Sequence, residues 1–217
     1  MKIILLGPPG AGKGTQCKRI IDAYGLTHLS SGDILRAERA AGSELGKKAQ
    51  SYMDSGGLVP DDLIIDMMIG AIKKASSAGY VLDGFPRTVA QAEGLDEALT
   101  KAGEKIDATV VLQVPDEAIL ERMTGRRSCP KCGAVYHIKY MKPKVEGQCD
   151  RGCGPLIQRK DDTPEVVSNR LKTYHEQTAA VVGYYERQQA TILRIDANQP
   201  IDSVTEAVLG SLKTLSI

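Results

Sequence analysis

The sequence predicts an α/β fold in which helices flank a five-stranded parallel sheet. Short apolar runs alternate along the chain with segments of helical period, which is typical of strands joined by right-handed helical crossovers. Residues 2–6 form an apolar run of the kind expected for a central strand that is buried on both faces. The composition changes at Gly125, where a segment rich in cysteine and glycine begins, so a small inserted unit interrupts the pattern.

Local signals define each element in turn. The segment Ser30-Ser31-Gly32-Asp33 offers N-caps for the helix from Ile34. Pro60 and Pro115 precede helices, and Thr163-Pro164 opens a long one. Strands are expected at 2–6, 26–29, 80–83, 108–114 and 191–195. Helices are expected at 16–24, 34–41, from 44 to about 54, 61–75, 88–101, 116–124, 163–189 with a bend near Gly183, and 201–215.

Bulk composition limits the function classes. The chain has 217 residues, 25% of them charged and 42% hydrophobic, with a net charge of +1. These values suit a globular protein of one domain with insertions or of two small domains, and they indicate neither a nucleic-acid surface nor a membrane surface. One Phe and no Trp supply few rings for stacking on bases. No apolar run approaches the length of a membrane span, and we expect a cytoplasmic protein.

A phosphate-binding loop follows the first strand. Gly7 is separated by four residues from Gly12-Lys13, and a helical stretch comes next. Glycines let backbone N–H groups point at phosphate oxygens, the helix N-terminus adds partial positive charge, and the lysine adds a full charge. The alternative is a plain glycine-rich turn. Gly14 stands where most such loops have Ser or Thr, and Thr15 comes one residue later, which disfavours a GTPase-like metal site.

Polar clusters follow two further strands. Ser30 to Asp33 follows the second strand, and Asp83 to Arg87 follows the third. Because the carboxyl ends of parallel strands meet at one edge, we expect these clusters to form a site with the glycine loop. Asp83 suits Mg²⁺ held through water, unless it is only a turn carboxylate, and Arg87 suits bidentate phosphate binding.

Four cysteines predict a metal site in the insert. Cys129 and Cys132 form a C-x₂-C pair, and Cys149 and Cys153 form a second pair. Two thiolate pairs at this spacing predict a Cys₄ zinc site, which is structural because four thiolates leave no open position. Iron or cobalt in the same tetrahedron, and four free thiols, are the alternatives. The second pair has three intervening residues, an extra one that Gly152 can absorb, and His137 is the reserve ligand. Cys17 lies apart and is expected in the core.

The loop sequence GPPGAGKGT and the sequence DGFPR together resemble adenylate kinase, in the long bacterial form with a zinc-bearing lid. The resemblance covers the whole chain and implies the Mg²⁺-dependent reaction of ATP and AMP to give two ADP. It implies a core of residues 1–29, 60–124 and 163–217, an NMP-binding domain of 30–59, and a zinc-binding LID domain of 125–162. We expect a monomer.

The resemblance also implies roles for individual residues. It assigns Lys13, Asp83, Arg87, Arg122, Arg126, Arg159 and Arg170 to the transfer of the phosphoryl group. ATP is expected to meet Gly10, Ala11, Gly12, Lys13, Gly14, Thr15, Arg126, Val135, Tyr136 and Gln199. AMP is expected to meet Ser31, Arg36, Gly57, Leu58, Val59, Gly84, Phe85, Pro86, Arg87 and Gln91, with Arg159 and Arg170 completing the substrate set.

Two rival hypotheses stay open at this point. Another nucleoside monophosphate kinase, specific for UMP, CMP or GMP, would differ by a few contacts around Ser31, Val59 and Gln91. A non-catalytic nucleotide switch or a zinc-ribbon module for nucleic acid is the second. The near-neutral charge, the lack of an N-K-x-D motif and the scarcity of aromatic residues disfavour it.

Overall fold

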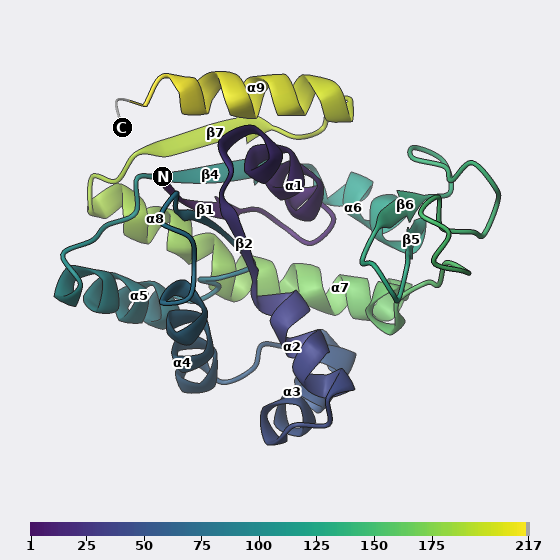
Figure 1. Cartoon of the computed structure of the whole chain (residues 1–217), viewed down its shortest axis with the longest axis horizontal. Helices are drawn as coiled ribbons and strands as arrows, with labels where there is room; N and C mark the ends of the chain where they lie inside the picture. The colour runs from purple at the N-terminus through teal and green to yellow at the C-terminus, as the bar shows by residue number, and fades with distance from the viewer. Residues whose placement is uncertain (216–217) are drawn as a thin grey trace.

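A computed structural model describes residues 1–215 of the chain. Its centre is a five-stranded sheet of β1 (Lys2–Leu6), β2 (Thr27–Ser30), β3 (Tyr80–Asp83), β4 (Ala108–Gln113) and β7 (Ile192–Asp196). The strand order is β2-β3-β1-β4-β7, and every neighbouring pair is parallel (Figure 1). The predicted parallel sheet is therefore confirmed, and β1 lies at its middle.

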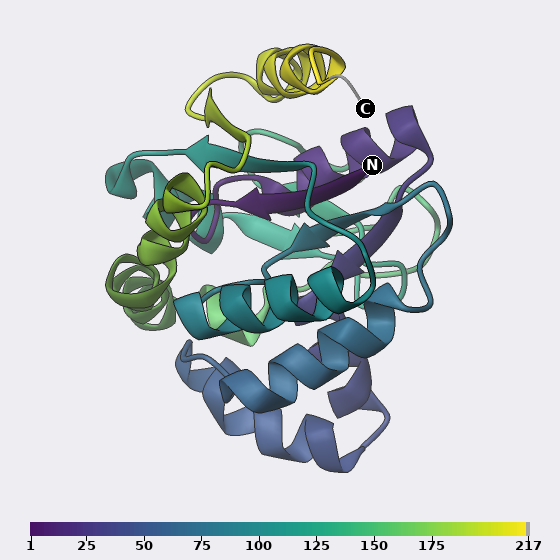
Figure 2. The same ribbon diagram turned by 90° about the vertical axis from the view of Figure 1, so that its left-hand side faces the viewer.

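Helices cover both faces of the sheet, as Figure 2 shows. Ile3 and Leu5 point to one face, where α1 (Lys13–Tyr24) and α9 (Ile201–Lys213) pack. Ile4 and Leu6 point to the other, toward α4 (Asp61–Ile72), α5 (Val89–Lys101) and α8 (Ala179–Arg187). Successive strand residues alternate between faces, so a strand that is buried on both sides needs an unbroken apolar run.

Two units project from this core at one end of the sheet. Helices α2 (Ser31–Ala40) and α3 (Glu44–Ser55) pack against each other after β2. The second unit follows α6 (Asp116–Thr124) and holds a hairpin of β5 (Arg126–Ser128) and β6 (Val135–His137). A 3₁₀ turn (Lys160–Asp162) and α7 (Pro164–Thr173) lead the chain back to the core. Figure 1 shows the hairpin unit as a separate lobe beside α6.

Element boundaries differ from the sequence predictions at several ends. Helix α1 begins at Lys13 rather than at 16, because Gly12 with φ of 87° is already the N-cap. Helix α4 ends at Ile72 rather than at 75, where short turns such as Lys74 N–H to the Ala71 carbonyl (3.1 Å) close it. Strand β2 begins and ends one residue later than predicted.

The predicted bend near Gly183 is wrong. The long helix is interrupted by a π-helical turn at Tyr174–Thr178, and Gly183 lies inside α8. The two halves pack in different places: Val167 of α7 joins a cluster with residues of α6, and Val181 of α8 joins the cluster that includes α5. A π turn lets one continuous helix meet two such neighbours, and apolar periodicity does not reveal its bonding pattern.

No helix within residues 1–215 has the length and hydropathy that crossing a membrane requires.

Candidate functional site

The three clusters predicted to share a site lie at one edge of the sheet. Asp83, the last residue of β3, is in register with Leu5 of β1 on one side and Ser30 of β2 on the other. The phosphate loop leaves β1 one residue beyond this line, and α2 begins directly after Ser30. Parallel strands thus bring the glycine loop, the Ser31 segment and the Asp83–Arg87 segment together at their carboxyl ends.

The phosphate loop has the backbone shape that its glycines predict. Gly10 and Gly12 have positive φ values of 76° and 87°. A Cβ on Gly7 would lie 2.7 Å from the carbonyl oxygen of Leu112, so the loop is held close to the end of β4. No side chain caps α1 and no acidic residue stands in its first turn. The N-terminal N–H groups of α1 therefore have no acidic side chain competing for them, which suits an anion.

Lys13 points back over this loop. Its Nζ donates to the carbonyl oxygens of Gly7 (2.7 Å) and Pro8 (2.8 Å). The pKa of Lys13 is lowered to about 7, chiefly by burial and also by the guanidinium groups of Arg87, Arg170 and Arg126, whereas the Asp83 carboxylate acts in the opposite direction. An amine in this position gains a strong preference for its charged form when an anionic phosphate approaches.

A hollow lies beside the loop, between α2, α3 and the end of β3. The Ser31 hydroxyl donates to the Gly84 carbonyl (2.6 Å), and Arg87 Nε donates to the same oxygen (2.7 Å). These two hydrogen bonds fix the Gly84 carbonyl, and Phe85, the next residue, is fully buried. Its lining includes most of the residues predicted for the substrate, namely Ser31, Arg36, Gly57, Leu58, Val59, Gly84, Arg87, Gln91 and Arg170. Phe85 and Pro86 do not line it, because Phe85 is fully buried and Pro86 lines the neighbouring hollow beside Lys13.

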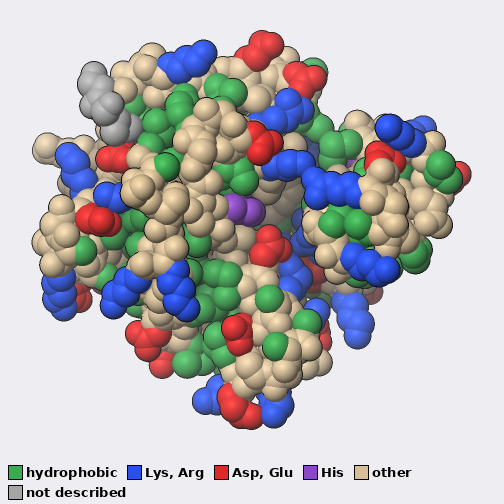
Figure 3. Space-filling view, in the orientation of Figure 1, with side chains coloured by type: hydrophobic (Ala, Val, Ile, Leu, Met, Phe, Trp, Pro, Cys, Tyr) green, Lys and Arg blue, Asp and Glu red, His purple; other side chains and the backbone are tan. Residues whose placement is uncertain are grey.

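Five arginines from distant parts of the chain lie close to one another here, and three of them line this hollow. Burial lowers the pKa of Arg159 and of Arg170 to about 10 each, and the nearby Arg126 acts in the same direction on both. Arg36 lies close enough to lower the pKa of Arg159, and Arg87 that of Arg170. Lys and Arg side chains border the notch between the hairpin lobe and the body (Figure 3). The structure thus brings together Arg36, Arg87, Arg126, Arg159 and Arg170.

Two aspartates that the sequence analysis missed bind two of these arginines, Arg126 and Arg170. Asp162 is fully buried and accepts two bonds from Arg126, at 2.9 Å from Nε and 2.5 Å from Nη2. Arg170 Nη1 donates to the Asp161 carboxylate (2.8 Å) and lies 3.7 Å from Asp162. Both aspartates follow Arg159 within three positions, so the two basic residues followed by two acidic residues at the exit of the insert were the available signal.

Arg122 does not join this cluster. Its guanidinium donates to the Ala197 carbonyl (3.0 Å) and to Asn198 Oδ1 (3.3 Å), next to Gln199, whose amide donates to Asp196 (3.0 Å). Arg127 folds back on the carbonyls of Thr124 and Arg126. The residues predicted to meet ATP are therefore divided, because Gln199 lies at the end of β7 whereas Val135 and Tyr136 belong to β6. Arg122, which was predicted to act in phosphoryl transfer, lies beside residues 197–199 instead.

Tyr136 lies inside the hairpin lobe. It is buried, and its hydroxyl accepts from the Asp150 N–H (3.0 Å) and lies 3.7 Å from Cys149 Sγ. The hydroxyl of Tyr136 therefore contacts the cysteine cluster. Val135, the neighbouring residue, is only partly buried.

Asp83 has a second neighbour that the sequence analysis did not identify. His28 Nε2 lies 3.3 Å from Asp83 Oδ2, and this hydrogen bond raises the pKa of His28. Cys17 completes a close group of three. Cys17 is fully buried, as predicted, and burial raises the pKa of its thiol well above the ordinary value. A thiol held in its protonated form is a poor metal ligand, so we assign Cys17 to the core.

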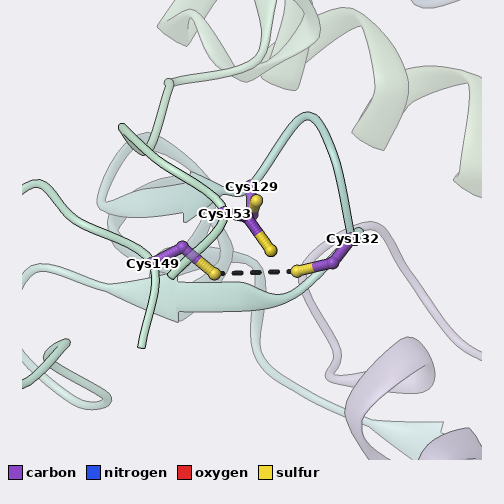
Figure 4. A group of neighbouring side chains, drawn as sticks. All are labelled: Cys129, Cys132, Cys149 and Cys153. Carbon is purple, nitrogen blue, oxygen red and sulfur yellow. Dashed lines mark hydrogen bonds between the residues drawn. The ribbon is translucent and has the colours of Figure 1, made fainter. Parts of the chain in front are cut away.

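The four cysteines of the insert form one cluster, with side chains that point toward a common centre (Figure 4). Their Sγ atoms all lie within 4.8 Å of one another, and the Cys132–Cys149 pair is 3.6 Å apart. Four sulfurs bound to one Zn²⁺ at 2.3 Å are about 3.8 Å apart, so the cluster fits the ion closely. The N–H of Arg151 lowers the pKa of Cys149 to about 6, whereas hydrogen bonding to Cys132 raises that of Cys153 to about 12. Without a cation these sulfurs cannot all be charged together.

The longer second cysteine pair closes as predicted. Gly152 adopts φ of 69°, and its N–H donates to the Cys149 carbonyl (2.9 Å), so the extra residue forms a tight turn. His137 is not part of the cluster. Its Nδ1 accepts from the N–H groups of Lys139 (3.0 Å) and Tyr140 (3.2 Å), and its Nε2 faces the Glu121 carbonyl (3.3 Å). His137 therefore braces the entry to the lobe.

A glycine loop at a helix N-terminus, faced by a second anion-binding hollow, defines a P-loop phosphotransferase that acts on nucleotides. Comparison with known proteins narrows this class. A family model described as adenylate kinase matches residues 5–190.

Relatives named adenylate kinase match nearly end to end. One from Lachnospira eligens is 53% identical over 98% of this chain and 100% of its own length. Others from Agathobacter rectalis and Clostridium acetobutylicum are 51% and 53% identical, each over 98% of this chain and 99% of their own lengths. The chain belongs to the adenylate kinase family, and it is a nucleoside monophosphate kinase of the α/β P-loop fold.

Proposed function

We propose that this chain catalyses the reversible, Mg²⁺-dependent transfer of a phosphoryl group from ATP to AMP, which gives two ADP. One observation carries the proposal: two anion-binding hollows adjoin each other and share their wall. The hollow that Lys13 lines and the hollow that Ser31 lines have Gly56, Leu58, Gly84, Arg87 and Arg170 in common. Two phosphate chains bound there would meet end to end, which is what direct transfer between nucleotides requires.

Each group of residues has a separate task in this proposal. The glycine loop and Lys13 bind the outer phosphates of ATP, and Arg36 and Arg87 bind the phosphate of AMP. Arg126, Arg159 and Arg170 neutralise the charge that spreads over the transferring group. Phosphoryl transfer depends mainly on alignment and charge neutralisation, so no side chain is required as a general base.

Family members use Mg²⁺ together with ATP, and Asp83 is the residue that suits this ion here. It ends β3 beside the loop, and a Cβ on Gly14 would lie 3.8 Å from its Oδ2. The ion, when bound with ATP, withdraws negative charge from the phosphate oxygens. We assign zinc to Cys129, Cys132, Cys149 and Cys153, where its role would be to fold the lobe. The hydrophobic cluster of the lobe consists of these cysteines and Tyr136, with only Ala134 and Leu156 of residues 1–215 packed against them.

The two projecting units are suited to closing over the nucleotides. We propose that residues 30–59 close over AMP and residues 125–162 close over ATP, around a core of 1–29, 60–124 and 163–217. Closure excludes water, which would otherwise accept the phosphoryl group. A contact already joins the first unit to the helix that leaves the second, because Asn169 donates to the Ser55 carbonyl (2.5 Å). The cytoplasmic location and the monomeric state stay predictions.

The test is an assay of ADP formation from Mg²⁺-ATP with AMP, UMP, CMP or GMP as acceptor. AMP should be the preferred acceptor, and Lys13→Met should lower kcat by about 10²–10³-fold through the loss of a transition-state charge contact. A preference for UMP or GMP would replace AMP with another acceptor. Unchanged turnover in the Lys13 variant would refute the proposed site.

A further inference from the structure

Gln91 lines the acceptor hollow, and the hydrogen bonds of its side-chain amide restrict which of its two polar atoms can bind each atom of a ligand. Gln91 is only 1% exposed and lies in the first turn of α5, where its N–H donates to the capping hydroxyl of Thr88 (3.1 Å). A primary amide has one acceptor oxygen and one donor nitrogen, and a half-turn about the last bond exchanges them. Which atom faces the ligand therefore depends on the partners that hold the other side.

Two such partners are present, and each allows only one orientation. The Arg87 N–H donates to Gln91 Oε1 at 2.8 Å. Gln91 Nε2 donates to the Asp61 carboxylate, also at 2.8 Å. A backbone N–H can only donate and a carboxylate can only accept. The reversed amide would place two donors against each other at Arg87 and two acceptors against each other at Asp61.

After these two bonds the amide keeps one lone pair on Oε1 and one N–H on Nε2. The 6-amino group of adenine donates and its N1 accepts, so this remaining pair complements adenine. In guanine or hypoxanthine O6 accepts and N1–H donates, which is the opposite order. We take the phosphate of such a nucleotide to be held by the same arginines, and its ring by the apolar wall of Leu35, Met53 and Val59. In that position a 6-oxo base requires Gln91 with its amide reversed.

We propose that Asp61 is a positioning residue that holds Gln91 in the orientation that selects a 6-aminopurine over a 6-oxopurine. Asp61 is the first residue of α4, and Gln91 belongs to α5, so the packing of these two helices sets the contact. The inference rests on the proposed function, because it takes a purine monophosphate as the acceptor. The inference adds the way in which Asp61 restricts the Gln91 amide to the orientation that suits a 6-aminopurine.

The test compares Asp61→Asn with the wild-type enzyme, using AMP and IMP as acceptors. IMP differs from AMP at the 6-position and at N1 and has no 2-amino group. An asparagine at 61 can accept or donate, so the restraint on the Asp61 side is removed, and only the Arg87 N–H still disfavours the reversed amide. We expect the ratio of kcat/KM for AMP to that for IMP to fall at least tenfold, partly through a gain in the rate with IMP.

Two further variants keep this test decisive. Asp62→Asn changes an exposed carboxylate in the same helical turn and should leave the ratio unchanged. Asp61→Glu keeps an acceptor-only carboxylate and should retain more selectivity than Asp61→Asn. The melting temperature and the KM for ATP are measured in parallel. An unchanged ratio, or equal losses with AMP and IMP, overturns the inference, whereas failure of the wild-type enzyme to phosphorylate AMP overturns the proposed function instead.

Discussion

Replacement of Asp162 by Asn should destabilise the protein and disorder the arginine cluster at once. The side chain of Asp162 is 0% exposed and that of Arg126 is 19% exposed, so water replaces little of the lost contact. The asparagine presents an N–H₂ group toward a guanidinium that can only donate. One of the two bonds from Arg126 is thereby lost, and the charge of Arg126 stays half-buried without its partner.

The size of this effect follows from the burial of the pair. Removal of one partner from a buried ion pair costs about 3–5 kcal/mol, and the partial exposure of Arg126 places the variant near the lower end, at about 3 kcal/mol. In a chain of this size, a loss of that magnitude lowers the melting temperature by about 6–12 °C. Because Arg170 also lies 3.7 Å from Asp162, kcat should fall as well, even at temperatures where the variant is fully folded.

The assay is urea and thermal unfolding, with kcat measured well below the melting temperature. Asp202→Asn is the matched control, because Asp202 also accepts from an arginine, Arg19 at 2.9 Å, but its side chain is 81% exposed. This control should lose less than about 1 kcal/mol and keep full activity. Equal losses of stability in the two variants would refute the argument that burial of the Arg126–Asp162 pair determines its contribution.

Three further predictions concern the remaining parts of the site. Because the pKa of Lys13 is about 7 in the free protein, ATP binding at pH 8 should take up close to one proton. The uptake should vanish as the pH falls below 7, and calorimetry in buffers of different ionisation enthalpy measures it; heats that do not depend on the buffer would contradict it. Chelation of the lid metal should lower the melting temperature and leave much of the activity at low temperature. Activity that follows metal content while the lobe stays folded would rule out a structural role. Arg122→Ala should raise KM for ATP roughly tenfold and leave KM for AMP unchanged, because Arg122 lies with residues 197–199, away from the acceptor hollow. An equal effect on both substrates would argue against that placement.

Several features of the protein were predictable from contiguous sequence. The glycine loop, the two cysteine pairs and the capping residue Ser30 act within a few positions of themselves, so their spacing already contains their geometry. The parallel sheet followed from the alternation of apolar runs and helical segments, and the shared edge followed from the rule for the carboxyl ends of strands. The turn at Gly152 was predictable for the same local reason.

Other features depended on the tertiary structure. Asp162 with Arg126, Asp61 with Gln91, and Arg122 with Ala197 pair residues that are 36, 30 and 75 positions apart, and no local pattern indicates which partners meet. The π turn at Tyr174–Thr178 is likewise associated with packing against two different helices rather than with its own residues. The sequence by itself determined which chemical groups this protein can offer, because motifs and caps act locally. Only the folded structure decided which of those groups are buried, charged and facing one another, because these properties depend on how distant segments pack.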